Sequence, residues 1–291
     1  MAGTPFTAAC VQVNASDDMA ANIAAASAFA RHAVDKSADL VLMPENVAMM
    51  TWGRAAILGS AKPESEHPAL KAFADLAREL KVWVHAGSLS VSLPNGKAAN
   101  RNYVLSPDGR IAAQYDKIHM FDVDLGNGER YAESATFHPG TAATMVDLPW
   151  GKLGLTICYD LRFPQLYRNL AQAGADFISV PSAFTQVTGE AHWHVLLRAR
   201  AIENGCFIFA PAQTGTHAGG RKTFGHALII NPWGEVLADA GTEPGVIMAA
   251  IEPAEVGRAR GKVPAIGLET GFSRLAPNLV SPNLASGGQK A

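Results

Sequence analysis

The fold prediction starts from one stretch of the chain, Gly154-Leu155-Thr156-Ile157-Cys158-Tyr159-Asp160-Leu161-Arg162-Phe163-Pro164. A run of strand-forming residues ends at Cys158, polar residues follow it, and Pro164 stands where a helix can begin. Open α/β sheets place their chemistry at the carboxyl ends of their strands. A free thiol is mostly protonated at neutral pH, because its ordinary pKa is about 8.5. Cys158 can therefore act as a nucleophile only if a neighbouring group removes its proton.

Strand and helix patterns alternate along the rest of the chain. Predicted strands cover residues 6–13, 39–43, 82–91, 101–106, 111–115, 144–148, 152–157, 177–180, 206–210, 227–231 and 245–251. Predicted helices cover a segment capped by Asp17 or Asp18 and running to about Lys36, and then 68–81, 164–173 and 191–203. The turn Pro149-Trp150-Gly151 predicts a hairpin. Mixed hairpins and helical crossovers favour a two-layer or four-layer α/β sandwich over a barrel.

Composition excludes several classes of function. The chain has 291 residues, of which 48% are hydrophobic, and a net charge of -2. This near-neutral balance argues against nucleic-acid partners and against binding to a membrane surface, and no apolar run is long enough for a membrane span. Three cysteines, Cys10, Cys158 and Cys206, without a CxxC pair, are typical of a reduced, cytoplasmic protein. We also see no secretion signal at the N-terminus.

Two further residues stand in settings like that of Cys158. Glu45 follows the apolar run 40–44 and precedes more apolar residues, so we expect a partly buried carboxylate that can act as a base. Lys117 follows a predicted strand and lies between Tyr115 and Ile118, so its ammonium can point into a pocket and stabilise an oxyanion. The alternatives are ordinary: glutamate and lysine are usually solvated, and a free cysteine is usually a core residue.

Three stretches together resemble the signatures of the nitrilase superfamily of carbon–nitrogen hydrolases: Met43-Pro44-Glu45-Asn46, Tyr115-Asp116-Lys117-Ile118-His119 and Ile157 to Pro164. They occur in the family's order, and the resemblance extends from Phe6 to about Ile266. It implies a four-layer αββα sandwich. We expect one domain over residues 1–272, followed by a partly disordered C-terminal extension over 273–291.

The resemblance also implies roles for these residues. Cys158 matches the nucleophile, Glu45 the general base, and Lys117 the group that stabilises the tetrahedral intermediate together with the backbone N–H of Tyr159. Glu133 matches a glutamate that positions the lysine, although Glu129 lies close by in the sequence. No metal or organic cofactor is implied. The pair His192 and His194 is not expected to bind zinc, because an H-x-H pair shares one face only in a strand and this segment is predicted to be helical.

Other segments resemble the Nit branch of the family, which contains deaminated glutathione amidases and ω-amidases. These segments are 181–193, 198–204 and 231–234. Arg162, Phe184 and Thr188 match residues that bind the carboxylate end of the substrate, although Arg162 could instead form a salt bridge with Asp160. The loop 212–217 favours the deaminated glutathione subgroup. The C-terminal segment 267–272 departs from the branch, which leaves the dimer geometry open.

The sequence therefore predicts a cysteine-dependent amidase that hydrolyses the amide of a small, carboxylate-bearing molecule through a thioester. Alternatives are an ω-amidase acting on α-ketoglutaramate, a nitrilase, an aliphatic amidase or an N-carbamoyl amino acid hydrolase, all of which share the same three central residues. A vestigial site on an interaction scaffold is a further alternative. We expect a homodimer or a higher homo-oligomer, and a small-molecule amide as substrate.

Overall fold

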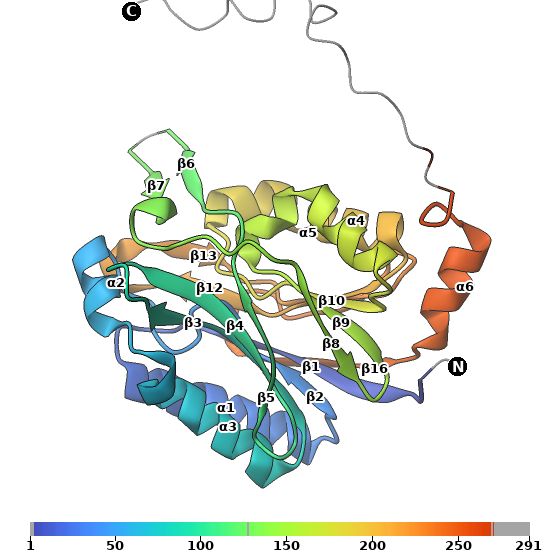
Figure 1. Ribbon diagram of the computed structural model, residues 1–291, viewed down its shortest axis with the longest axis horizontal. Coiled ribbons are helices and arrows are strands. Elements are labelled where there is room, and N and C mark those ends of the chain that lie inside the picture. Colours follow the sequence, from blue (N-terminus) through green and yellow to red (C-terminus); the bar gives the residue numbers. More distant parts are fainter. Residues whose placement is uncertain (1–2, 127, 269, 271–291) are drawn as a thin grey trace, which may run out of the picture.

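Two β-sheets packed face to face form the centre of the molecule, and helices cover both outer faces (Figure 1). The computed structural model describes residues 3–126, 128–268 and 270. Helices α1 (Met19–Asp35) and α3 (Pro68–Leu80) cover the first sheet, and α4 (Pro164–Gln172) and α5 (Gln186–Asn204) cover the second. The expected four-layer αββα sandwich is confirmed.

The strands of each sheet come from distant parts of the chain. In spatial order the first sheet contains β13 (Lys222–Phe224), β12 (Ala212–Thr216), β1 (Phe6–Val13), β2 (Leu40–Leu42), β3 (Trp83–Ser92), β4 (Ala98–Leu105) and β5 (Ile111–Asp116), with β16 (Gly245–Ile251) antiparallel to β1. The second contains β15 (Val236–Asp239), β14 (Leu228–Ile230), β11 (Phe207–Ala210), β10 (Phe177–Ser179), β9 (Gly151–Leu155) and β8 (Thr144–Leu148). A separate hairpin pairs β6 (Asp122–Asp124) with β7 (Arg130–Ala132). Further helices are α2 (Arg54–Ser60), α6 (Ala254–Lys262) and 3₁₀ turns at Glu64–Glu66, Glu133–Ala135, Cys158–Arg162 and Ala218–Gly220.

Strand β1 shows why the central strands are largely apolar on both of their faces. Ala8 and Cys10 belong to the apolar cluster that includes the second sheet, whereas Ala9 and Val11 belong to the cluster formed with α1 and α3. Successive side chains of a strand point to opposite faces, so both faces of β1 are buried. A strand in this position has no solvent face, and its sequence therefore lacks the alternation of polar and apolar residues.

Most predicted elements are present, with shifted ends. Asp18 caps α1 by accepting a hydrogen bond from the backbone N–H of Ala21, and β8 and β9 form the predicted hairpin. Helix α5 begins five residues before the predicted start, at Gln186, because the side chain of Thr185 accepts from the N–H of Thr188. Strands β6, β7, β12, β13 and β15 and helices α2 and α6 were not predicted. The expected extension over 273–291 lies outside the described residues.

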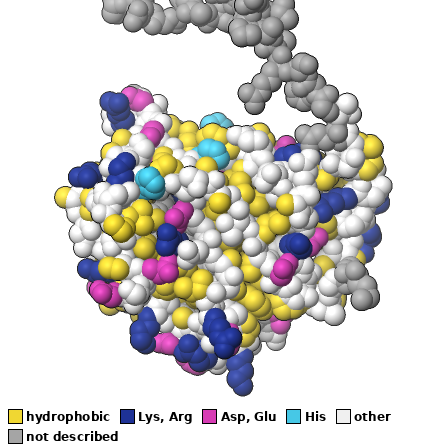
Figure 2. Space-filling view, viewed as in Figure 1, with side chains coloured by type: hydrophobic (Ala, Val, Ile, Leu, Met, Phe, Trp, Pro, Cys, Tyr) yellow, Lys and Arg dark blue, Asp and Glu magenta, His cyan; other side chains and the backbone are white. Residues whose placement is uncertain are grey.

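Among the residues that the structure describes, no helix is both long and apolar enough to cross a bilayer. On the face shown in Figure 2, Lys and Arg side chains are interspersed with Asp and Glu side chains. This arrangement matches the small net charge of the sequence.

We predict that Gly87→Ala destabilises the fold and displaces the strand end that carries Glu45. Gly87 has a φ of +60°, and a Cβ atom there would lie 2.0 Å from the carbonyl oxygen of Pro44. The matched control is Gly96→Ala, because Gly96 also has a positive φ (+77°) but a Cβ atom there would meet nothing within 4 Å. Both substitutions strain the backbone by about 1 kcal/mol, so thermal unfolding should show a clearly larger loss for Gly87→Ala. Equal losses would contradict this role for Gly87.

Candidate active site

Glu45 lies just beyond the carboxyl end of β2, where the chain is fixed against β3. The N–H of Ser88 donates to the carbonyl of Pro44 (3.3 Å), and the N–H of Asn46 donates to the Ser88 hydroxyl (3.1 Å). Only 3% of Glu45 is exposed. Its oxygens accept hydrogen bonds from Asn100 Nδ2 (2.9 Å), from Lys117 Nζ (3.0 Å) and from the N–H of Ala183 (2.9 Å). The carboxylate is therefore buried and fully satisfied, as a buried charge must be.

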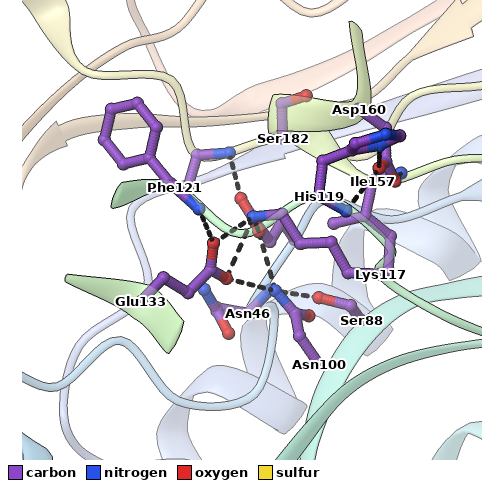
Figure 3. A network of polar contacts seen from close by, with 12 residues as sticks. Asn46, Ser88, Asn100, Lys117, His119, Phe121, Glu133, Ile157, Asp160 and Ser182 are labelled. Atoms are coloured by element: carbon purple, nitrogen blue, oxygen red, sulfur yellow. Dashed lines mark hydrogen bonds and ion pairs between the residues drawn. The ribbon is translucent and has the colours of Figure 1, made fainter. Parts of the chain in front are cut away.

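Lys117 directly follows β5, and its ammonium lies between two carboxylates. Nζ is 3.0 Å from Glu45 Oε1 and 2.9 Å from Glu133 Oε2, and 2% of the lysine is exposed. Figure 3 shows the Lys117 side chain extending to Glu133, which also accepts from the N–H of Phe121 (2.6 Å) and from Asn100 (3.3 Å). Glu129 instead accepts from the Tyr131 hydroxyl (2.8 Å). Of the two nearby glutamates, it is thus Glu133 that contacts the lysine.

Cys158 opens a 3₁₀ turn shortly after β9, on the second sheet. Its backbone is left-handed, with a φ of +48°, which is uncommon and strained for a residue with a side chain. The N–H of Cys158 donates to Pro181 (3.0 Å) and the N–H of Asp160 donates to Ile157 (3.0 Å). No acceptor among the described residues takes the intervening N–H of Tyr159. That donor is available to a bound molecule.

The Asp160 carboxylate links the 3₁₀ turn that begins at Cys158 to the segment around Lys117 by hydrogen bonds. Its side chain is wholly buried and accepts from the N–H of Ile157 (2.9 Å) and from both the N–H (3.0 Å) and ring Nδ1 (2.7 Å) of His119 (Figure 3). It also accepts from the hydroxyl of Tyr115 (2.7 Å). Tyr115 and His119 flank Lys117 in the sequence. The nucleophile candidate and the lysine are therefore positioned by one shared carboxylate. Asp160 forms no ion pair with Arg162, so the alternative role considered for Arg162 is not found.

The charges in this cluster shift one another's pKa values. Burial raises the pKa of Glu45, but attraction to Lys117 and Arg221 and hydrogen bonds from Cys158 and Lys117 outweigh it and hold that pKa below its ordinary value. Burial lowers the pKa of Lys117, yet the two carboxylates raise it overall. Burial and the neighbouring Glu45 raise the pKa of the Cys158 thiol, although Lys117 opposes them. The resting site thus holds a neutral thiol beside an ionised carboxylate.

A cavity of about 240 Å³ opens onto these groups. Among the expected substrate-binding residues, Tyr159, Phe184 and Thr188 line it, together with Glu45, Lys117, Glu133 and Cys158. Arg162 does not line it: its guanidinium lies against the rings of Phe184 (5.4 Å) and Tyr159 (5.9 Å) and 3.3 Å from His192 Nδ1. The size suits a small molecule, and the lining mixes aromatic walls with a few polar groups.

The two histidines of the H-x-H pair have different surroundings. His192 contacts Arg162, whereas His194 lies beside His226 and Asp239, and one ligand-type atom from each of these three lies within 4.8 Å of the others. Asp239 accepts from His194 Nε2 (3.0 Å) and His226 Nδ1 (2.9 Å). None of the three lines the cavity.

Sequence reasoning missed three residues that shape the site. Asn100 lies inside β4 and bridges both carboxylates, Asp160 links the two loops, and Arg221 lines the cavity. Asn100 and Arg221 carry no local signal, because a strand asparagine and a loop arginine are both ordinary. Asp160 had one available signal: it lies two residues from Cys158, within the signature stretch 157–164.

Comparisons with known proteins agree with this geometry. The family model described as carbon-nitrogen hydrolase matches residues 7–261. The chain is 41% identical over 272 residues to a protein of Synechocystis named deaminated glutathione amidase, covering 90% of this chain and 97% of that one. The crystal structure of the C. elegans NitFhit protein superposes with a TM-score of 0.86 at 33% identity, covering 92% of this chain but only 66% of that longer one. The structure of Saccharomyces cerevisiae Nit3, titled a member of branch 10 of the nitrilase superfamily, gives a TM-score of 0.82 at 28% identity, covering 90% and 96%.

The lowered pKa of Glu45 predicts a pH-dependent contribution to stability. A carboxylate whose folded pKa lies below its unfolded value stabilises the fold above that unfolded value, about 4.3, and this contribution is lost as the pH falls through the folded pKa. Glu45→Gln should therefore lower the free energy of unfolding by about 3 kcal/mol or more at pH 7, because it leaves buried partners unpaired. The difference from the unmodified protein should shrink between about pH 5 and pH 3 in urea titrations.

The control for this prediction is Glu66→Gln, which removes an exposed carboxylate. It should change the unfolding free energy by less than about 0.5 kcal/mol at every pH. A Glu45→Gln deficit that stays constant down to about pH 3 would contradict the ionised state assigned to Glu45.

Proposed function

The chain belongs to the carbon–nitrogen hydrolase family, and on that premise we propose that it is a cysteine-dependent amidase acting on a small, carboxylate-bearing amide of the deaminated glutathione type. One observation carries the proposal: Glu45 interacts with both the Lys117 ammonium and the Cys158 thiol at the wall of a cavity. The name of the Synechocystis relative supports the substrate class.

The first half-reaction forms a thioester. Glu45 takes the thiol proton as Cys158 Sγ bonds to the amide carbonyl carbon, and the carbonyl oxygen becomes an oxyanion. Lys117 Nζ and the N–H of Tyr159 donate to that oxygen. An ammonium has three donors, so Lys117 can hold its two carboxylates and still reach the substrate. The C–N bond then breaks, and the leaving nitrogen takes the proton from Glu45.

The second half-reaction hydrolyses the thioester and regenerates the free enzyme. Water attacks the thioester carbon while Glu45 accepts its proton, and the same two donors hold the second oxyanion. The C–S bond breaks, the sulfur recovers the proton from Glu45, and the carboxylic acid leaves. Nucleophile, base and oxyanion donors all come from the chain, so the proposed reaction requires no cofactor.

Glu133 acts in this scheme as a positioning residue. Its two oxygens bind Lys117 Nζ, and the N–H of Phe121 anchors one of them at 2.6 Å. Lys117 is thereby held charged and in place, which preorganises the electrostatic stabilisation of the oxyanion. Phe184 and Thr188 line the cavity beside Tyr159 and are proposed to contact the substrate.

We also propose a homodimer. Helix α5 exposes an apolar stripe at Val187, Ala191, Val195 and Ile202, which fall on one face of the helix and are interrupted by the exposed Arg198. The exposed Trp233 extends this surface, because its turn packs on α5: Arg198 Nε donates to the carbonyl of Gly234 (2.8 Å). An exposed face rich in apolar side chains favours association with another protein surface.

We also propose that the protein is cytoplasmic. All three cysteines are unpaired, and Cys158 must stay reduced to attack a carbonyl. A reducing compartment meets that requirement.

The function is tested by measuring release of acid and of amine or ammonia from deaminated glutathione, α-ketoglutaramate, a simple aliphatic amide and a nitrile. We expect deaminated glutathione to be preferred, and Cys158→Ala to lower kcat by at least about 10⁴-fold, the scale of losing a nucleophile. Cys10→Ala is the matched control and should keep turnover, because Cys10 is a core residue outside the cavity.

Retained turnover in Cys158→Ala would contradict the mechanism. Preference for α-ketoglutaramate would keep the mechanism and change the substrate. Activity on the nitrile or the simple amide alone would contradict the carboxylate-bearing class.

The dimer is tested by Val195→Glu, which puts a charge in the centre of the apolar stripe. The exposed fraction of Val195 is 68%, so the substitution should leave the monomer folded and shift the molar mass in light scattering from dimer to monomer. Ile111→Glu is the control, because Ile111 is an exposed apolar residue on the opposite sheet. If only Ile111→Glu dissociated the protein, the proposed surface would be wrong.

A further inference from the structure

Two histidines and one aspartate form a cluster at the surface, outside the cavity that holds the reacting groups. His194 lies on α5, His226 lies two residues before β14, and Asp239 is the last residue of β15. One ligand-type atom from each lies within 4.8 Å of the other two. Three separate elements thus bring together imidazole and carboxylate groups, which are the ligands that zinc and similar metals prefer.

The distances inside the cluster suit one shared ion. Asp239 Oδ2 lies 3.0 Å from His194 Nε2 and 3.2 Å from His226 Nδ1. Ligand atoms at about 2.0–2.2 Å from a tetrahedral zinc ion are about 3.3–3.6 Å from one another. Only small shifts are therefore needed for binding. A nitrogen that binds a metal is deprotonated, so each neutral imidazole then carries its proton on its other ring nitrogen.

The backbone of His226 is held in a conformation that directs its ring toward α5. Its φ of +53° is left-handed, which is uncommon for a residue with a side chain. Its N–H donates to the carbonyl of Gly241 (2.7 Å), and its carbonyl accepts from Nε1 of Trp193, the neighbour of His194 (2.7 Å). The ring of Phe224 stacks on the His226 ring at 4.5 Å between centroids. The two imidazoles are therefore fixed relative to each other by contacts that do not involve Asp239.

The carboxylate of Asp239 is oriented and ionised. Its Oδ1 accepts from the N–H of Gly241 (2.9 Å). Burial raises the pKa of Asp239, but hydrogen bonds from His194 and from Gly241 outweigh it and hold that pKa below its ordinary value. The side chains of His194, His226 and Asp239 are between 24% and 36% exposed. An ion can thus reach them from solvent, and water can fill its remaining positions.

We propose that His194, His226 and Asp239 form a binding site for a divalent transition-metal ion such as Zn²⁺. The ion joins α5 to the β14–β15 hairpin and stabilises the fold. It takes no part in the bond changes at Cys158, so this proposal does not depend on the amidase function.

The neighbouring His192 supplies a matched control. It lies two residues before His194 on the same helix, but its Nδ1 faces the guanidinium of Arg162 at 3.3 Å. A guanidinium repels a metal cation, and His192 does not belong to the cluster. The proposed site therefore does not use the H-x-H pair as such.

The test is a Zn²⁺ titration of the full chain, without a histidine tag, by isothermal titration calorimetry. We expect one ion per chain. His194→Gln and Asp239→Asn should each weaken binding at least about tenfold, the scale of disturbing a metal ligand. His192→Gln should leave the Kd nearly unchanged. Cys158→Ala should also leave it unchanged, which separates this site from a zinc-binding thiol in the cavity.

His226 needs a substitution that respects its backbone. Asn tolerates the left-handed conformation better than other residues with side chains, so His226→Asn removes the imidazole with little added strain. This variant should lose Zn²⁺ binding as His194→Gln does.

Two further measurements do not rely on the calorimetry. With free Zn²⁺ at one hundred times the Kd, the Tm of the unmodified protein should rise by about 5 °C, and the Asp239→Asn variant should show no rise. In a crystal soaked with Zn²⁺, an anomalous peak should lie about 2.0–2.2 Å from His194 Nε2 and Asp239 Oδ2.

The proposal is overturned if Asp239→Asn binds Zn²⁺ as tightly as the unmodified protein, if His192→Gln loses as much affinity as His194→Gln, or if the anomalous peak lies only at Cys158. Absence of Zn²⁺ binding by the folded, unmodified protein would overturn it as well. The proposed function fails separately, because Zn²⁺ binding at the cluster is measured without any amide.

Discussion

The buried ammonium of Lys117 forms ion pairs with two carboxylates, and the packing of the two sheets depends on this cluster. Glu45 and Glu133 are both buried or nearly so, and two carboxylates so close would repel each other without a cation between them. Their oxygens also accept from Asn100 and from the N–H groups of Ala183 and Phe121. Buried ion clusters persist only when every partner is satisfied in this way. The two sheets must therefore pack in one register, because Ala183 follows a strand of the second sheet, whereas Asn100 lies in the first sheet and Glu45 and Lys117 follow its strands.

The same cluster determines where the single mobile proton lies. Glu45 and Cys158 are neighbours that cannot both be ionised cheaply, and Lys117 together with Arg221 favours the ionised carboxylate. The proton therefore stays on sulfur in the resting state. A thiol held neutral is less open to oxidation than an exposed thiolate. In the proposed reaction the proton moves only when sulfur bonds to carbon, because the negative charge then passes to the substrate oxygen beside Lys117.

The sequence predicts those features of the fold and of the site that leave a local pattern of residues. Strand 6–13 and helix 68–80 were predicted almost to the residue, because their periodicity reflects burial that is local to the element. Glu45, Lys117 and Cys158 were found because each follows a strand in an apolar setting, and their meeting was supplied by the family resemblance. Asn100 and Arg221 were not found, since their importance arises only from the partners that folding brings to them. The substrate-binding role of Arg162 stays a prediction: its guanidinium lies against Tyr159 and Phe184, and both of these residues line the cavity.

The strained backbone of Cys158 accounts for the free N–H of Tyr159, which is the proposed second oxyanion donor. A left-handed residue with a side chain costs about 1–3 kcal/mol and survives only where its surroundings fix it. Here the carbonyl of Pro181 accepts a hydrogen bond from the N–H of Cys158. The Asp160 carboxylate accepts hydrogen bonds from Ile157, Tyr115 and His119 around the turn. Glycine would adopt this conformation without strain, but glycine has no thiol. The chain therefore accepts the strain at the residue that is proposed to react, and the resulting turn leaves the N–H of Tyr159 without an internal acceptor. One backbone conformation thus places both the proposed nucleophile and the proposed second oxyanion donor.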